Sequence, residues 1–111
     1  MKIEIQGQDA LQATEELLKI EGLSGSYETV KEKEKEAFTL ATIISIVGMT
    51  SGILNIAEKL FQWKEKYQKS KQDTNGAKIE KVLIVTADGR RLLLKDTTTL
   101  EQIQAILEKS K

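Results

Sequence analysis

Hydrophobic and polar residues alternate at the start of the chain. Isoleucine occupies every second position within residues 2–6, which is the period of a half-buried strand. After this strand, Asp9 can cap a helix that ends at Gly22, because apolar residues recur between them at a helical period: Leu11, Leu17 and Leu18. A second strand is predicted around residues 27–30, where Tyr27, Thr29 and Val30 precede an alternating run of lysine and glutamate.

The last third of the chain predicts a hairpin followed by a helix. Residues 78–86 and 90–95 are rich in isoleucine, valine and leucine, and they flank Asp88-Gly89, a dipeptide typical of tight turns. Thr98 and Glu101 have the spacing of a capping box at a helix N-terminus. The helix that follows has one apolar face, made of Leu100, Ile103, Ile106 and Leu107.

The middle of the chain contains 21 consecutive uncharged residues, from 37 to 57. Apolar side chains spaced alternately three and four residues apart extend through this stretch into the charged segment after it: Ile46, Met49, Ile53, Ile56, Leu60, Trp63 and Tyr67. This heptad spacing predicts one continuous helix from about residue 37 to 69. A helix of that length would be on the order of 50 Å long and would extend beyond a domain of about 30 Å.

The predicted long helix is apolar on more than one side. A second apolar row contains Leu40, Ile44, Val47, Leu54 and Phe61, and a stripe of small residues that includes Gly48, Gly52 and Asn55 lies between the rows. Such a helix is buried by its own fold, by a protein partner or by lipid. Gly48 and Gly52 also have the spacing of close helix pairs. Membrane insertion stays an alternative, because the stretch is long enough to span a bilayer but contains six polar residues.

The order of predicted elements is βαβ, a long α, ββ and α. We therefore expect a single α+β domain over residues 1–111, with a four-stranded mixed sheet and helices mainly on one face. The second strand is expected beside the first, after a right-handed crossover through the first helix.

Composition narrows the possible functions. The chain has 17 basic and 17 acidic residues and no histidine or cysteine. Without these two residue types there is no imidazole acid–base group, no thiol nucleophile and no typical zinc site, so we expect no enzyme, no metal and no cofactor. The balanced charge gives no reason to expect nucleic acid. No secretory signal is visible at the N-terminus, and we expect a cytoplasmic protein.

Two groups of cations leave alternatives open. One group surrounds two aromatic residues and forms either a surface for nucleic acid or an anionic membrane, or a solvated helix end: Lys64, Lys66, Lys69 and Lys71. Arg90 and Arg91 either bind an anion or are the polar residues of an exposed turn.

A family resemblance covers nearly the whole chain. It is found in the N-terminal stretch MKIEIQGQDA, the helix TSGILNIAEKLFQWKEKY and the hairpin KIEKVLIVTADGRRLLL. With these features the chain resembles the bacterial effector-associated constant component family. The resemblance implies a small non-enzymatic component, encoded beside effector proteins in conflict or defence systems. It implies no catalytic residues.

The sequence thus predicts an adaptor or regulatory component whose partner is an effector protein or a second copy of the chain. The expected partner-binding residues lie on the predicted long helix: Leu40, Ile44, Val47, Gly48, Gly52, Leu54, Asn55 and Phe61. The alternative is a membrane-acting protein whose 37–57 helix inserts and oligomerises.

Overall fold

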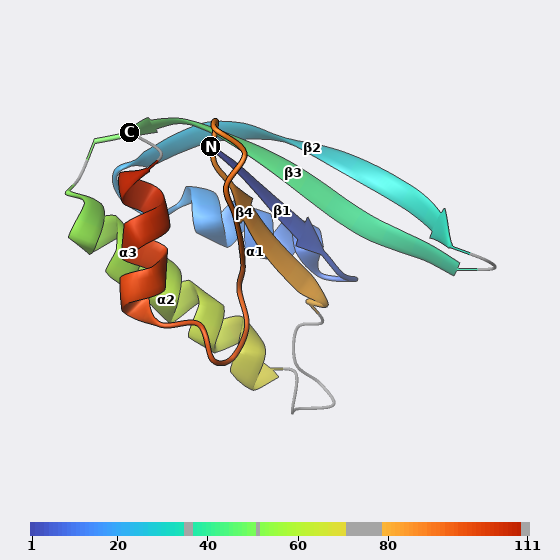
Figure 1. Cartoon of the computed structure of the whole chain (residues 1–111). Helices are drawn as coiled ribbons and strands as arrows, with labels where there is room; N and C mark the ends of the chain where they lie inside the picture. Colours follow the sequence, from blue (N-terminus) through green and yellow to red (C-terminus); the bar gives the residue numbers. More distant parts are fainter. Residues whose placement is uncertain (35–36, 51, 71–78, 110–111) are drawn as a thin grey trace.

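A computed structural model describes residues 1–34, 37–50, 52–70 and 79–109. The elements, in chain order, are β1 (Lys2–Gln6), α1 (Ala10–Leu18), β2 (Leu23–Glu34), β3 (Ala37–Met49), α2 (Ile53–Ser70), β4 (Lys81–Val85), β5 (Arg91–Leu93) and α3 (Leu100–Glu108). The predicted α+β class is confirmed (Figure 1).

The five strands form one antiparallel sheet with the order β2-β3-β1-β4-β5. The first strand lies at its centre and pairs with β3 on one side and β4 on the other. The predicted four-stranded mixed sheet is therefore wrong. Its expected crossover is also wrong, since β2 pairs with β3 rather than with β1.

The predicted continuous helix over 37–69 is wrong in its first half. Residues Ala37–Met49 form β3, which pairs with β2 from Leu23↔Met49 to Glu34↔Ala37, and the helix α2 begins only at Ile53. Six of the nine residues at 39–47 are threonine, isoleucine or valine. Such β-branched side chains favour strands over helices, and β1 offers β3 a second strand to pair with.

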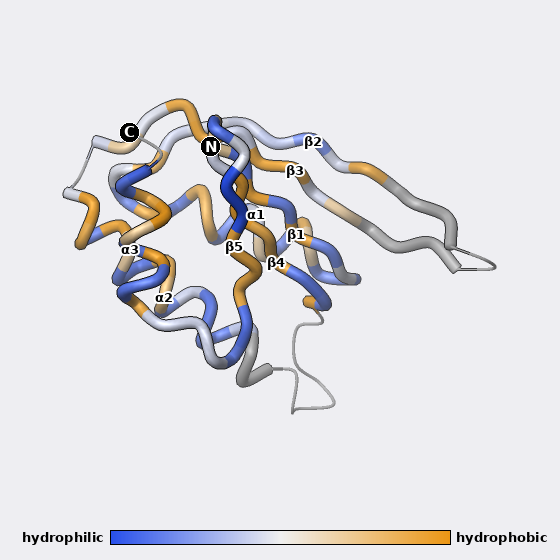
Figure 2. The backbone as a smooth tube through the Cα atoms, viewed as in Figure 1, coloured by the Kyte–Doolittle hydropathy of each residue, from blue (hydrophilic) through white to orange (hydrophobic). Residues whose placement is uncertain are grey.

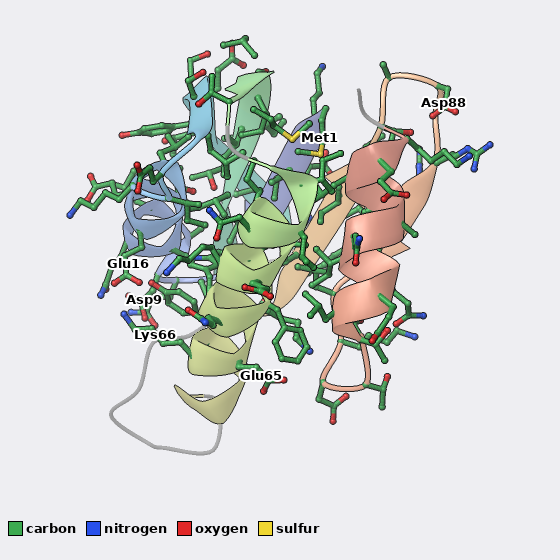
Figure 3. The ribbon with its side chains drawn as sticks, turned by 90° about the vertical axis from the view of Figure 1, so that its left-hand side faces the viewer. Met1, Asp9, Glu16, Glu65, Lys66 and Asp88 are labelled. Carbon is green, nitrogen blue, oxygen red and sulfur yellow. The ribbon has the colours of Figure 1, made fainter. Side chains whose placement is uncertain are left out.

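All three helices lie against one face of the sheet (Figure 3). The strands alternate accordingly: Ile3, Ile5 and Ile84 are buried, whereas their neighbours along the chain are not. From Ile53 onward the predicted heptad spacing describes a real helix face, because four of its residues in α2 are buried: Ile56, Leu60, Trp63 and Tyr67.

Polar contacts join α1 to both the sheet and α2. The Thr14 and Thr42 hydroxyls are hydrogen bonded at 2.5 Å, and the indole nitrogen of Trp63 donates to the Ala13 carbonyl at 3.1 Å. These three side chains are buried, so each bond satisfies a polar group that water cannot reach. Asp9 occupies the predicted N-cap of α1, but its side chain makes no capping hydrogen bond.

The C-terminal hairpin and helix form where predicted, with shorter strands. Gly89 adopts a φ of +90° in the turn, a conformation that favours glycine. The capping box of α3 lies one residue later than predicted. Thr99 and Gln102 make its two reciprocal hydrogen bonds, at 3.2 and 2.9 Å, whereas the Thr98 hydroxyl accepts a bond from the Lys95 amide.

Candidate partner-binding surface

The chain passes from β3 to α2 at an exposed corner. We define the β3–α2 corner as residues 47–50 and 52–55; every one of them is exposed or half-buried. Val47 is 80% exposed and Leu54 is 49% exposed, the two highest values among the exposed large hydrophobic residues described. In Figure 2, where the tube is coloured by residue hydropathy, hydrophobic residues follow β3 up to this turn and occur again at the start of α2.

A β-bulge gives Val47 its position. The pairing of β2 with β3 shifts between Ser24↔Gly48 and Gly25↔Ile46, so Val47 is the extra residue on β3. Bulges of this kind bend a strand and redirect its side chains. At Gly25, an added Cβ would overlap the carbonyl oxygen of Ser45 on the neighbouring strand, so only glycine fits there without a shift.

Backbone hydrogen bonds fix both sides of the corner. The Ile46 amide donates to the Met1 carbonyl at 2.9 Å, and the Thr50 amide donates to the Gly22 carbonyl at 2.8 Å. The Ile56 amide then donates to the Gly52 carbonyl at 3.1 Å and closes the first turn of α2. The exposed apolar side chains therefore belong to a backbone with defined hydrogen bonds.

The structure brings together only part of the predicted partner-binding set. Val47, Gly48, Gly52, Leu54 and Asn55 all belong to the β3–α2 corner. They do not share a helix face, because the first two end a strand and Gly52 precedes the first residue of α2. The predicted small-residue stripe of one helix is therefore wrong.

The other three predicted residues lie outside the corner. Ile44 is fully buried between the sheet and the helices, so it is not available at the surface of this fold. Phe61 is half-buried against the core, two turns further along α2. Leu40 pairs through its backbone with Lys31, and its side chain is outside the described part.

The sequence pattern did not identify Met49 and Ile53 as corner residues. Both are half-buried, pack against the core and flank the exposed Thr50 and Gly52. The heptad spacing placed them within one continuous helix. A switch from strand to helix between them, with Gly52 as the local signal, would have put them at a corner instead.

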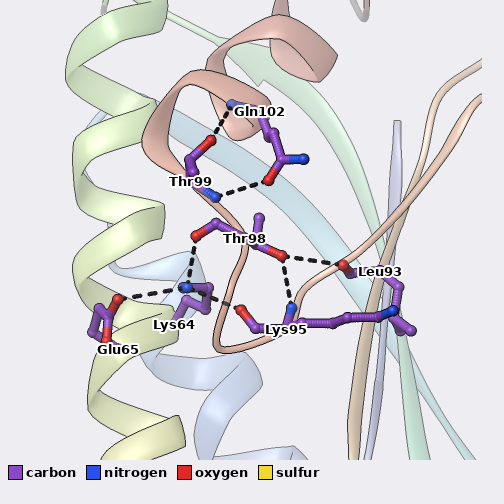
Figure 4. A network of polar contacts seen from close by, with 7 residues as sticks. All are labelled: Lys64, Glu65, Leu93, Lys95, Thr98, Thr99 and Gln102. Atoms are coloured by element: carbon purple, nitrogen blue, oxygen red, sulfur yellow. Dashed lines mark hydrogen bonds and ion pairs between the residues drawn. The ribbon is translucent and has the colours of Figure 1, made fainter.

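Two lysines of the predicted cluster, Lys64 and Lys66, bind other parts of the fold, whereas the side chains of Lys69 and Lys71 lie outside the described part. The ammonium group of Lys64 is buried and donates to the carbonyl oxygens of Lys95 and Thr98, at 3.0 and 2.9 Å (Figure 4). It also lies 3.5 Å from a carboxylate oxygen of Glu65 and 4.8 Å from the centre of the Phe61 ring. Lys64 therefore holds the loop before α3 against α2.

A second cation of the cluster, Lys66, pairs with α1. Its ammonium group donates to both carboxylate oxygens of Glu16, at 2.8 and 2.9 Å, and Figure 3 shows the two residues at the same end of the helices. This bond lowers the pKa of Glu16 below its ordinary 4.5. Burial raises the pKa of the neighbouring Tyr67, whose hydroxyl has no hydrogen-bond partner among the described residues. Lys66 thus ties α1 to α2.

Neither a metal site nor a membrane-spanning helix is found in the described part of the chain. Within residues 1–34, 37–50, 52–70 and 79–109, no group of three or more acidic side chains is placed to hold a metal ion. In the same ranges, no helix has the length and apolar character needed to cross a membrane. The predicted helix over 37–57 on which the membrane-acting alternative depended is replaced by β3 and the start of α2.

Comparisons with known proteins add no family assignment. No family model matches the chain. No curated protein matches it, and no solved structure does so either.

Proposed function

We propose that this chain is a non-enzymatic adaptor or regulatory component of a bacterial conflict or defence system, which associates with itself or with an effector protein through the β3–α2 corner. The observation that supports this function is the exposure of Val47 and Leu54, at 80% and 49%, on a backbone fixed by hydrogen bonds. Exposed apolar side chains that a fold holds in place are typical of surfaces that bind another protein.

The exposed apolar area of the β3–α2 corner limits how much the corner can contribute to the free energy of binding. Burying the exposed parts of Val47 and Leu54 against a partner would contribute roughly 2–4 kcal/mol. Association itself costs about 4–15 kcal/mol, so these two side chains are anchors that need further contacts around them. Met49 and Ile53 supply adjacent apolar surface, while Asn55 supplies a polar group.

The resemblance supplies the biological setting of the proposal. In the family that the sequence resembles, such a component is encoded beside an effector protein and carries no catalytic residues. A partner-binding corner gives a component of this kind a direct means of contact with its effector.

Light scattering coupled to size exclusion tests this function. The chain is measured alone over a range of concentrations and after co-expression with the protein encoded by the neighbouring gene. The Val47→Gln/Leu54→Gln variant is compared with Leu11→Gln, which changes another exposed leucine, 39% exposed, on α1.

We expect a self-assembly or a complex with the effector, which the corner variant loses and the Leu11→Gln variant keeps. Circular dichroism should show the same fold for all three proteins. A monomer that forms no complex with the neighbouring protein, or a complex that the corner variant retains, would contradict the proposal.

A further inference from the structure

The sheet has an edge strand with a hollow beside it. β5 is the last strand in the sheet order, and no strand of the described residues pairs with its outer side. Between β5 and α3 the surface is hollowed by about 300 Å³, the lower end of the size range of ligand pockets. The lining combines apolar residues, Leu92, Ala105 and Ile106, with the cations Arg90, Arg91 and Lys109.

Backbone groups of β5 point away from the sheet next to this hollow. The Leu94 amide donates to Val82 and the Thr86 amide donates to Arg90, both at 2.9 Å. Because bonded pairs alternate along an antiparallel ladder, the amide and carbonyl of Arg91 and the amide of Leu93 face the open edge. The hydroxyl of Thr98 donates to the Leu93 carbonyl at 3.3 Å, so that group is already satisfied.

The residues that line the hollow carry an excess of positive charge. Asp88 accepts a hydrogen bond from the Arg90 guanidinium at 3.0 Å and from the Thr86 hydroxyl, and this hydroxyl keeps the pKa of Asp88 low. Asp88 therefore balances the charge of Arg90, which is one of the three cations that line the hollow. Arg91 and Lys109 remain, and the lining includes no acidic residue. Figure 3 shows Asp88 at the outer tip of the hairpin, near the last turn of α3.

From this arrangement we infer that the hollow binds an extended acidic segment of a partner protein, which adds as a strand to the open edge of β5. The Arg91 amide and carbonyl pair with the backbone of that segment, its acidic side chains lie near Arg91 and Lys109, and its apolar side chains enter the hollow against Leu92 and Ile106. A groove between an edge strand and a helix is a recurrent means of peptide recognition.

A short, charged edge strand is also a means by which native sheets avoid pairing with other chains. The two roles differ in what they require next to the strand. Protection of an edge needs no cavity, whereas an added strand needs space for the side chains that alternate along it. The hollow between β5 and α3 provides that space.

Titration followed by nuclear magnetic resonance tests this inference. The probe is a six-residue peptide of alternating glutamate and valine, added to the full chain labelled with nitrogen-15. A second peptide of the same sequence carries methyl groups on its backbone amides, which removes the donors of a strand ladder. The charge variant Arg91→Glu/Lys109→Glu is matched by Lys59→Glu/Lys81→Glu, two exposed lysines outside the hollow.

We expect saturable shift changes at the amides of β5 and the last two turns of α3, weakened about tenfold in the charge variant and unaffected in its control. The methylated peptide should not bind. No saturable change up to about 1 mM peptide would overturn the inference. Equal binding of the methylated peptide, or equal weakening in the control variant, would also overturn it.

This inference does not depend on the β3–α2 corner, because the corner and the hollow share no residue. Peptide binding should persist in the Val47→Gln/Leu54→Gln variant, and assembly through the corner should persist in the Arg91→Glu/Lys109→Glu variant. Failure of either proposal can therefore be recognised separately.

Discussion

The uncharged stretch at the centre of the chain divides into two regions with opposite environments. Residues 41–46 lie within the sheet, where Ile44 is fully buried under the helices. Residues 47–50 and 52–55 form the β3–α2 corner, where Val47 is 80% exposed. The two side chains are both β-branched and apolar and are three residues apart. Their difference shows that the sheet register and the bulge decide burial, and that hydropathy alone does not.

The largest expected loss of stability is at Ile44, the buried residue of the two. Replacing Ile44→Ala should lower the free energy of unfolding by about 2–5 kcal/mol, because it leaves a cavity between β3 and the helices. Val47→Gln should change it by no more than about 0.5 kcal/mol, as expected at an exposed position. Urea denaturation followed by circular dichroism measures both values. Equal losses in the two variants would contradict the assigned environments.

A substitution at Gly25 should disturb the β-bulge that separates the two regions. A Gly25→Ala substitution places a methyl group against the Ser45 carbonyl oxygen and should cost about 1–3 kcal/mol, because the backbone must shift. We also expect the amide resonances of residues 46–48 to move, since the bulge lies there. The matched control is Ser26→Ala, an exposed position on the same strand. An unchanged stability in Gly25→Ala would show that the bulge is absent.

The lysines of α2 show the same contrast, since the side chain of Lys64 is buried and that of Lys59 is exposed. A Lys64→Met variant keeps most of the side-chain volume but leaves the carbonyls of Lys95 and Thr98 without their donor, which should cost about 1–3 kcal/mol. The exposed Lys59→Met should cost little. Thermal unfolding of the two variants compares them directly. If Lys64→Met is as stable as Lys59→Met, the loop before α3 is held by other contacts.

The smallest expected effect concerns the partly exposed pair of Glu16 and Lys66. The pKa of Glu16 is lowered in the folded state, so its contribution is present above the unfolded pKa and is lost as the pH falls through the folded pKa. Glu16→Gln should therefore be less stable than the wild type at pH 7, by less than about 1 kcal/mol, and equal to it in acid. Glu15→Gln is the control, and a difference that persists in acid would contradict the assignment.

Local signals in the sequence predicted the parts of the fold that depend on neighbouring residues. The alternation at Ile3 and Ile5 predicted β1, and Asp88-Gly89 predicted the hairpin turn. The spacing of Ile56, Leu60 and Trp63 predicted that these residues share one face of a helix, and in the structure that face is buried. Each of these patterns is complete within one element.

The errors arose where the outcome depends on distant pairing. The heptad spacing continues from Met49 to Ile53 across the end of β3, so it joined a strand and a helix into one predicted helix. β3 forms because β1 and β2 lie on either side of it, which the local sequence does not specify. For the same reason, Ile44 and Val47 were assigned to one surface although they differ in burial.

Thiol labelling of single-cysteine variants tests most directly that the uncharged stretch is a buried strand followed by an exposed corner. The chain has no cysteine, so Ile44→Cys, Val47→Cys and Leu54→Cys each introduce the only thiol. In a continuous helix these positions share one face and would react with a maleimide at similar rates. We expect the Val47→Cys and Leu54→Cys variants to react as fast as a free thiol, and Ile44→Cys to react only as the fold opens. Similar rates at all three positions in the folded protein would contradict this account.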